Sequence, residues 1–246
     1  MKASMTALVA LCAVSISACD HGSARTTGTP VSRASGFPTA SENAAIDAAA
    51  LRLARERRAE PCSSVKSCQR ATVFVDGKAL SDGLISIVGR SLLVHDLGGR
   101  ATATAYTDMM GDPKSAFLRW VLTASTYEAL LRLDAASRLS SDEEGGVRAR
   151  LEKTEQAIAD GTISVTEPGD GQRLSGTALV AYEANLKQDY EVAALTDAYS
   201  HRPHPQQLYR DLIKSSLAKH SVEFTAGVGL TDADVLTYAS QVTSGH

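Results

Sequence analysis

The sequence contains none of the short motifs that mark common enzyme active sites. It has no G-x-S-x-G nucleophile elbow, no G-x-x-x-x-G-K-[ST] phosphate loop, no H-E-x-x-H metal helix and no G-x-G-x-x-G fingerprint. It also has no block of Lys and Arg with interleaved aromatics, which argues against a nucleic-acid partner. The sequence therefore predicts no cofactor or metal, and any active site must be assembled from distant residues.

The N-terminal segment is too short for a membrane span but has the layout of an export signal. Lys2 precedes an apolar run from residue 7 to residue 16, whereas a permanent transmembrane helix needs roughly 20 apolar residues. The run ends in I-S-A-C at residues 16–19, an aliphatic residue and two small ones before a cysteine. This ending resembles the lipobox of bacterial lipoproteins. The resemblance implies that residues 1–18 are cleaved and that Cys19 carries the lipid.

The lipobox resemblance implies a bacterial cell-envelope protein that is lipid-anchored and faces the periplasm, with inner and outer membrane both open. The three acyl chains typical of that family hold a protein essentially for good, because each buried methylene contributes about 0.8 kcal/mol. The alternative is a secreted protein that is cleaved after Ala18 and keeps Cys19 as an easily oxidised thiol.

Cysteine is scarce, and after the signal and the lipidated residue only Cys62 and Cys68 remain. An oxidising envelope favours a disulfide between them. Closure of so short a loop contributes less than about 3 kcal/mol, so the bond would fix a local turn. The alternative is a redox or metal pair, although redox pairs usually have C-x-x-C spacing and zinc needs two further ligands.

Residues 19–40 are rich in Gly, Ser, Thr and Pro and contain almost no large apolar side chain, so we expect a lipidated flexible tether. About twenty such residues have a root-mean-square reach of roughly 25 Å. Residues 41–246 are long enough for a sizeable core and are predicted to form a single helix-rich globular domain. Lys2 leaves with the signal, so 24 of the 25 basic residues remain beside 28 acidic ones, a formal charge of −4.

Periodicity predicts a mainly α-helical α+β fold, with a helical core and a small antiparallel sheet in the first half. The sheet is predicted from β-rich runs between residues 71 and 107, with Asp76-Gly77 as a hairpin turn. Residues 84–97 also fit a helix interrupted at Gly89. Capped apolar patterns predict helices over 41–60, 113–139, 147–161, 179–193, 205–217 and from 231 onward, and β-rich runs predict strands at 71–75, 84–88, 92–97 and 100–107.

The histidines and acidic pairs have simple structural explanations. On a strand, the neighbours His95 and Asp96 would point to opposite faces, which argues against a catalytic dyad. Prolines around His201 and His204 favour an extended connector, in which the two rings need not converge on a metal. Helix-dipole complementarity explains the acidic residues at two helix starts without calcium: Asp142, Glu143, Glu144, Asp232 and Asp234.

Two further features have a packing and a binding interpretation. Trp120 lies on the apolar face of a predicted helix and is expected to pack in the core rather than stack on a ligand. Arginines near the end of the first helix are expected to form a solvated face that matches the helix dipole, rather than a lipid-binding patch: Arg52, Arg55, Arg57 and Arg58.

An anchor, a tether and the absence of catalytic spacing favour a lipid-anchored binding protein with a protein partner. In organisation only, such a chain resembles the immunity lipoproteins that neutralise toxin effectors arriving in the periplasm. The second hypothesis is an envelope hydrolase that uses His95 or His201 with carboxylates brought close by folding. A structural envelope lipoprotein is the third.

Overall fold

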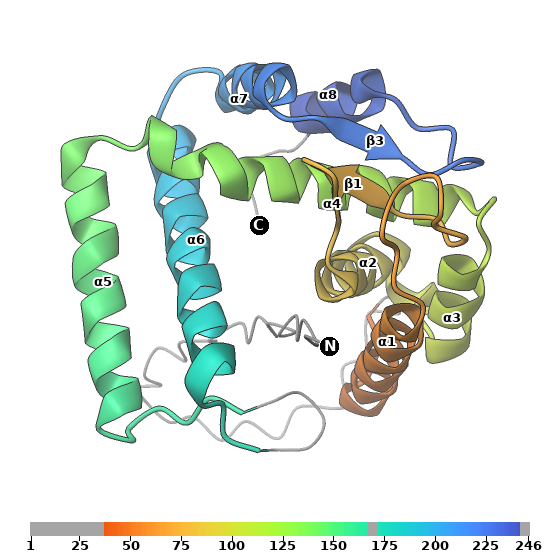
Figure 1. Cartoon of the computed structure of the whole chain (residues 1–246), viewed down its shortest axis with the longest axis horizontal. Helices are drawn as coiled ribbons and strands as arrows, with labels where there is room; N and C mark the ends of the chain where they lie inside the picture. Colours follow the sequence, from red (N-terminus) through yellow and green to blue (C-terminus); the bar gives the residue numbers. More distant parts are fainter. Residues whose placement is uncertain (1–36, 167–171, 242–246) are drawn as a thin grey trace, which may run out of the picture.

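The computed structural model of the chain describes residues 37–166 and 172–241 (Figure 1). The predicted signal, Cys19 and most of the predicted tether lie outside these ranges, so their assignments remain predictions. Within them, α-helices surround one long central helix, and a three-stranded antiparallel sheet packs on that helix. This confirms the predicted fold class, a mainly helical α+β fold.

The first described helix, α1 (Ala40–Ala59), begins one residue before its predicted start at residue 41, because Thr39 is its N-cap, and it ends just before Pro61 as predicted. The Thr39 hydroxyl accepts a hydrogen bond from the N–H of Glu42 (3.2 Å), and the Glu42 carboxylate accepts one from the N–H of Thr39 (2.6 Å). This capping box satisfies N–H groups that no helical carbonyl can reach. Pro61 follows the last turn and cannot continue the helix.

The sheet consists of β1 (Val73–Val75), β2 (Lys78–Ala79) and β3 (Val222–Phe224), with β1 in the middle and both neighbours antiparallel to it. The turn Asp76-Gly77 has positive φ at both residues, 49° and 72°, as a two-residue type I′ hairpin requires. The predicted hairpin turn is therefore confirmed. The sheet lies only partly in the first half of the chain, because β3 comes from near the C-terminal end.

The strands predicted between residues 84 and 107 are wrong, and for residues 84–97 the structure has the alternative that the sequence left open, a helix. This segment forms two helices, α2 (Asp82–Leu97) and α3 (Ala103–Gly111), joined by the 3-10 turn η1 (Gly98–Arg100). Short apolar runs fit a buried strand and a buried helix equally well, and the choice between them depends on tertiary contacts.

Capping and close packing make α2 a continuous helix. The Ser81 side chain accepts a hydrogen bond from the N–H of Gly83 (3.2 Å) and so starts the helix. A Cβ atom at Gly89 would lie 3.2 Å from the Met110 sulfur and 3.4 Å from the Tyr106 ring, both on α3. Gly89 therefore permits the close approach of two helices and does not interrupt α2.

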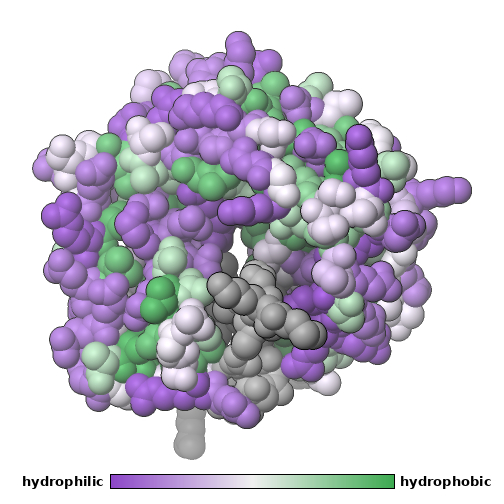
Figure 2. Space-filling view, viewed as in Figure 1, coloured by the Kyte–Doolittle hydropathy of each residue, from purple (hydrophilic) through white to green (hydrophobic). Residues whose placement is uncertain are grey.

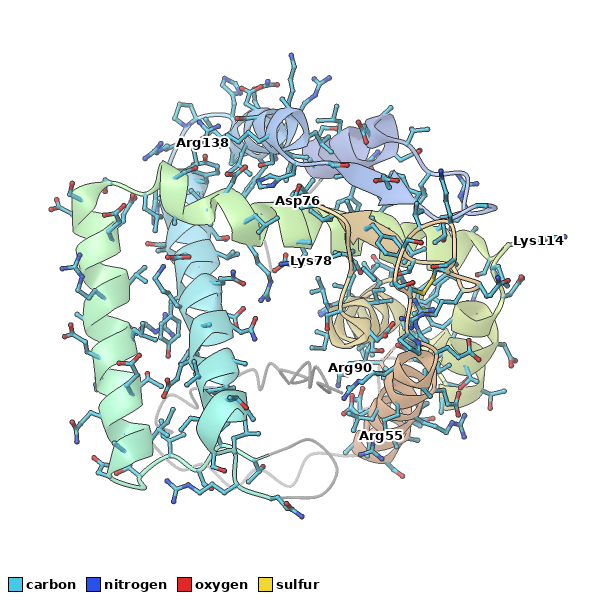
Figure 3. All side chains as sticks on the ribbon, in the orientation of Figure 1. Arg55, Asp76, Lys78, Arg90, Lys114 and Arg138 are labelled. Atoms are coloured by element: carbon cyan, nitrogen blue, oxygen red, sulfur yellow. A yellow bond between two sulfur atoms is a disulfide. The ribbon has the colours of Figure 1, made fainter. Side chains whose placement is uncertain are left out.

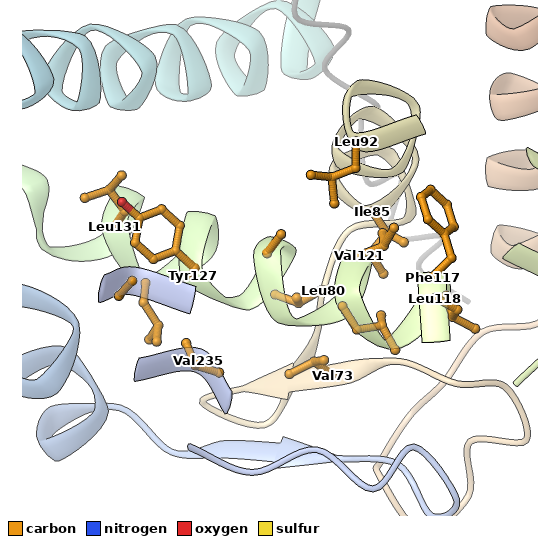
Figure 4. Packing of buried hydrophobic residues seen from close by; sticks show 14 of the residues in the cluster. Val73, Leu80, Ile85, Leu92, Phe117, Leu118, Val121, Tyr127, Leu131 and Val235 are labelled. Carbon is orange, nitrogen blue, oxygen red and sulfur yellow. The ribbon is translucent and has the colours of Figure 1, made fainter. Parts of the chain in front are cut away.

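The central helix is α4 (Ala116–Asp134), which continues into the 3-10 turn η2 (Ala135–Arg138). Ser115 caps α4 by accepting hydrogen bonds from the N–H groups of its first turn. The helix therefore begins three residues after Pro113, its predicted first residue. Buried residues occur on most sides of α4 rather than on one stripe, because other elements pack around much of this helix (Figure 4).

Four helices complete the fold. α5 (Ser141–Ala159) and α6 (Gly176–Ser200) form a pair of adjacent helices that extends away from the sheet (Figure 1). α7 (Pro205–Lys219) and α8 (Asp232–Gln241) pack on each other and on α4. All four overlap helices that the sequence predicts, although α5 starts earlier and α6 is longer.

A cluster of tyrosine rings packs at the interface between α4 and the C-terminal helices. The Tyr127 ring contacts those of Tyr209 and Tyr238 edge-on, with centroids 6.5 and 5.3 Å apart, and Tyr199 meets Tyr209 at 5.1 Å. Such pairs contribute about 0.5–1.5 kcal/mol each beyond the area that they bury. Burial raises the pKa of Tyr238 to about 12 and also raises that of Tyr127, so both phenols stay neutral.

Candidate functional site

A groove of about 450 Å³ opens between the hairpin turn, α2, the last turns of α4, and α6. Figure 2 shows a hollow on this face of the molecule, between α6 and the part that contains α1 and α2. The groove is lined by segments that lie far apart in the sequence, so no local sequence motif could predict it. We call this opening the α4–α6 groove.

The floor of the α4–α6 groove is apolar. Leu84 and Ile87 of α2 and Ala129 of α4 are half-buried there, while Leu133 at the end of α4 is 46% exposed. Removing apolar surface from water beneath a partner contributes a favourable free energy of about 25 cal/mol per Å². The floor can therefore bind an apolar side chain.

Arg132 forms part of the wall and is neutralised by two carboxylates. Its Nε lies 3.0 Å from Glu128 on the same helix, and its Nη1 lies 2.6 Å from Asp189 on α6. Burial raises the pKa of Asp189, while the nearby Arg132 guanidinium opposes that effect. One cation shared by two carboxylates has no charge left for an incoming anion, so Arg132 fixes α6 against α4.

The polar groups that remain for a ligand are at the rim. Lys78 is exposed, and no hydrogen bond or ion pair engages its ammonium group in the described ranges. Figure 3 shows this side chain at the hairpin end of the open space beside α6. The Asn185 amide donates to the Ala181 carbonyl oxygen (2.8 Å), which leaves its own carbonyl oxygen as an acceptor, and Gln188 lies one turn further along α6.

His220, which follows α7, connects that helix to the hairpin turn. Its Nδ1 lies 2.8 Å from Asp76, and the N–H of Ser221 donates to the same carboxylate (3.0 Å). These hydrogen bonds hold the pKa of Asp76 below its usual value. The other ring nitrogen lies 3.7 Å from Asp134. Both nitrogens face carboxylates, so the ring bridges two elements and is not presented to a substrate.

Asp134 is the centre of a buried polar network at the end of α4. Its carboxylate accepts hydrogen bonds from the Ser216 hydroxyl and from the Lys219 ammonium group, the latter at 3.0 Å. Burial opposes ionisation of Asp134, but these two hydrogen bonds outweigh it and hold its pKa below the usual value. Ser216 is fully buried and bonds to a carboxylate rather than to an imidazole, so it is not an activated nucleophile.

A second buried cluster corrects the prediction of a fully solvated arginine face. Arg57 Nε lies 2.9 Å from Asp82, and its Nη2 donates to the Ala71 carbonyl oxygen (2.8 Å). Arg70 Nη1 reaches the same Asp82 oxygen at 2.6 Å. Arg57 is therefore a tertiary contact between α1 and the start of α2, whereas Arg52 is exposed and pairs with a neighbour on its own helix.

The structure places the Cys62 and Cys68 sulfurs within disulfide-bonding distance of each other, as their spacing predicts. The pair closes the loop between α1 and β1. Cys19 lies outside the described residues, so lipidation remains a prediction.

The candidate histidines of the hydrolase hypothesis do not line the α4–α6 groove. His95 is in the last turn of α2, on a helix rather than the expected strand. His201 and His204 are exposed at the end of α6 and the start of α7. Within residues 37–166 and 172–241, no three His, Cys, Asp or Glu side chains converge in a way that could hold a metal ion.

The acidic residues at helix starts have the structural roles that the sequence predicts. Glu143 completes a capping box with Ser140 on α5, and Asp234 accepts hydrogen bonds from the N–H and hydroxyl of Thr231 at the start of α8. Trp120 packs partly buried on the core and meets the Phe117 ring edge-on. The sequence offered no signal for Asp134 or His220, because their partners lie on distant segments.

No family model, curated protein or solved structure matches this chain. In the part of the chain that the structure describes, no helix is both long enough and apolar enough to cross a membrane.

The Asp134 network predicts an acid-sensitive contribution to stability. Because the folded-state pKa of Asp134 is depressed, its contribution is present above the unfolded pKa of about 3.9 and is lost as pH falls through the folded value. We expect Asp134→Asn to lower the free energy of unfolding by about 1–2 kcal/mol at pH 7, since Lys219 is half exposed and partly screened.

Urea unfolding between pH 7 and pH 3 measures this effect, with exposed Asp108→Asn as the control. The stability difference between Asp134→Asn and the parent protein should shrink below about pH 4. A difference that stays constant over the whole range would contradict the assignment.

Proposed function

We propose that the protein is a lipid-anchored, periplasm-facing binding protein that engages a partner protein through the α4–α6 groove. The observation that carries this proposal is the combination of an apolar floor, where Leu133 is exposed, with unpaired polar groups at the rim. This is the usual composition of a recognition site, in which apolar surface supplies affinity and a few polar groups fix orientation.

The groove is better suited to a protein segment than to chemistry on a small molecule. Two of its charged side chains, Arg132 and Asp76, are committed to internal ion pairs, and apart from Lys78 its other polar side chains are amides and a serine hydroxyl. The ammonium group of Lys78 favours a partner with an acidic side chain beside an apolar one. Asn185 and Gln188 can bond to the main chain of an extended segment.

Lipid anchoring supports an inhibitory role. The tether predicted from the sequence, about twenty residues long, would let the domain search a shell of roughly 25 Å beside the membrane and so raise its effective concentration there. An immunity protein that must neutralise a toxin effector before it acts gains from this arrangement. The proposed function is therefore stoichiometric binding of a secreted effector.

The hydrolase and the structural lipoprotein are the alternatives. The geometry that comes nearest to a catalytic pair is Asp76 with His220, but the second nitrogen of that ring faces Asp134. His95 and His201, the residues proposed from the sequence for a hydrolase, lie away from the groove lining.

The anchor is tested by Cys19→Ala. We expect the variant to lose acylation and to leave the membrane fraction, while its circular dichroism and thermal unfolding match those of the parent, because the acylated residue precedes the folded part. Fractionation and mass spectrometry of the N-terminal peptide measure both. Membrane retention of an unacylated variant would show that the anchor lies elsewhere.

The groove is tested by substitution on its floor. The anchored protein, in detergent, is used to capture partners from envelope extract, and binding of any partner is then measured for Leu133→Asp. A charge on the floor should weaken binding at least about tenfold, which is 1.4 kcal/mol. Ile163→Asp is the matched control, because Ile163 is similarly exposed, at 40%, and lies outside the groove lining. Equal binding by both variants would refute the proposed site.

A further inference from the structure

The loop that carries Cys62 and Cys68 lies against the buried cluster formed by Arg57, Asp82 and Arg70. Arg70 connects the two features. Its Nη1 donates to Asp82 at 2.6 Å, while its Nε lies 3.3 Å from the Cys62 sulfur. Asp82 therefore positions a guanidinium group whose Nε lies within hydrogen-bonding distance of the Cys62 sulfur.

The charges of this cluster do not balance. Two guanidinium groups share one carboxylate, which leaves an excess of one positive charge among side chains that are only 9–13% exposed. Burial lowers the pKa of Arg57, and although Asp82 opposes that effect, the charge of Arg70 adds to it. A disulfide sulfur is neutral and accepts hydrogen bonds weakly, so it does not relieve the excess. A thiolate at Cys62 would make the cluster neutral.

The second sulfur has the opposite environment. The Cys68 sulfur lies 3.4 Å from the backbone carbonyl oxygen of Arg70. A carbonyl oxygen can only accept a hydrogen bond, so it favours a protonated Cys68 thiol and disfavours a thiolate. Arg70 thus favours different protonation states of the two reduced cysteines. Its side chain stabilises the Cys62 thiolate, and its main-chain carbonyl oxygen stabilises the Cys68 thiol.

We propose that Cys62 and Cys68 form a thiol–disulfide exchange site that accepts two electrons from a dithiol, with Cys62 as the leaving thiolate. Attack by a thiolate of the dithiol on the Cys68 sulfur breaks the disulfide, and the electron pair remains on Cys62. The second thiolate of the dithiol then attacks the first dithiol sulfur, which is bonded to Cys68 in the mixed disulfide. Cys68 leaves and takes up a proton. The dithiol is oxidised to a disulfide, the cysteine pair is reduced, and the second proton passes to solvent.

Two properties of the pair support exchange over a purely structural bond. Stabilising the reduced form makes a disulfide easier to reduce, because the equilibrium depends on the free energies of both forms. The loop is also accessible, since both cysteines are half-buried and the residues between them are mostly exposed. Neither property depends on the proposed binding function of the α4–α6 groove.

The first test uses the mature acylated protein without substitution. After reduction, iodoacetamide alkylation is followed by mass spectrometry of each cysteine peptide as a function of pH. At pH 6 we expect Cys62 to react at least about tenfold faster than Cys68, because an unperturbed thiol has a pKa of about 8.5. Equal rates for the two residues, rising together near pH 8.5, would overturn the proposal.

The second test measures the equilibrium of the pair with reduced and oxidised glutathione. The Arg70→Gln variant removes the charge beside Cys62, and we expect it to shift the equilibrium toward the disulfide by at least about tenfold. Arg70→Lys should retain part of the effect, and thermal unfolding checks that each variant is folded. An unchanged equilibrium in a folded Arg70→Gln variant would mean that the disulfide is structural only.

Discussion

The central helix α4 is buried along most of its length, and two of its buried hydroxyl groups are satisfied by carbonyl oxygens of the helix itself. The Thr123 and Thr126 hydroxyls donate to main-chain carbonyls four residues earlier, at 2.9 and 2.7 Å. Such internal bonds remove most of the cost of taking a hydroxyl out of water. Most of α4 is covered by other helices, with α2 and α3 packed toward its start and α6, α7 and α8 toward its end, whereas α1 packs on α2 and α3, and α5 packs on α6.

The end of α4 explains both the stability of the fold and the groove. Asp134 ties it to α7, and Arg132 ties it to α6, so these contacts hold the last turns from two sides. The third side stays open between α6 and α2, and there Leu133 remains in contact with water. The groove is thus a consequence of where the covering helices stop.

Local sequence signals predicted most of the helices and the hairpin turn, and contacts between distant segments determined the remaining structure. Capping residues and the Asp76-Gly77 turn specify structure within a few residues, so the hairpin and most of the helices could be predicted, whereas strands were predicted in the segment that forms α2 and α3. Residues 84–97 were ambiguous because Gly89 reads as a break, while its role depends on the approach of α3. The pairing of His220 with Asp76 joins positions 144 residues apart. Sequence reasoning therefore found the cysteine pair but neither polar network nor the groove.

Native-state hydrogen exchange of the mature protein tests this account most directly. If α4 is the scaffold, its amide hydrogens should exchange only through global unfolding, so their protection should match the free energy of unfolding measured with denaturant. The amides of α5, which packs mainly on α6, should exchange faster through local opening. Exchange of the middle turns of α4 at the rate of α5 would contradict the claim that the fold, the Asp134 network and the groove are all built on this helix.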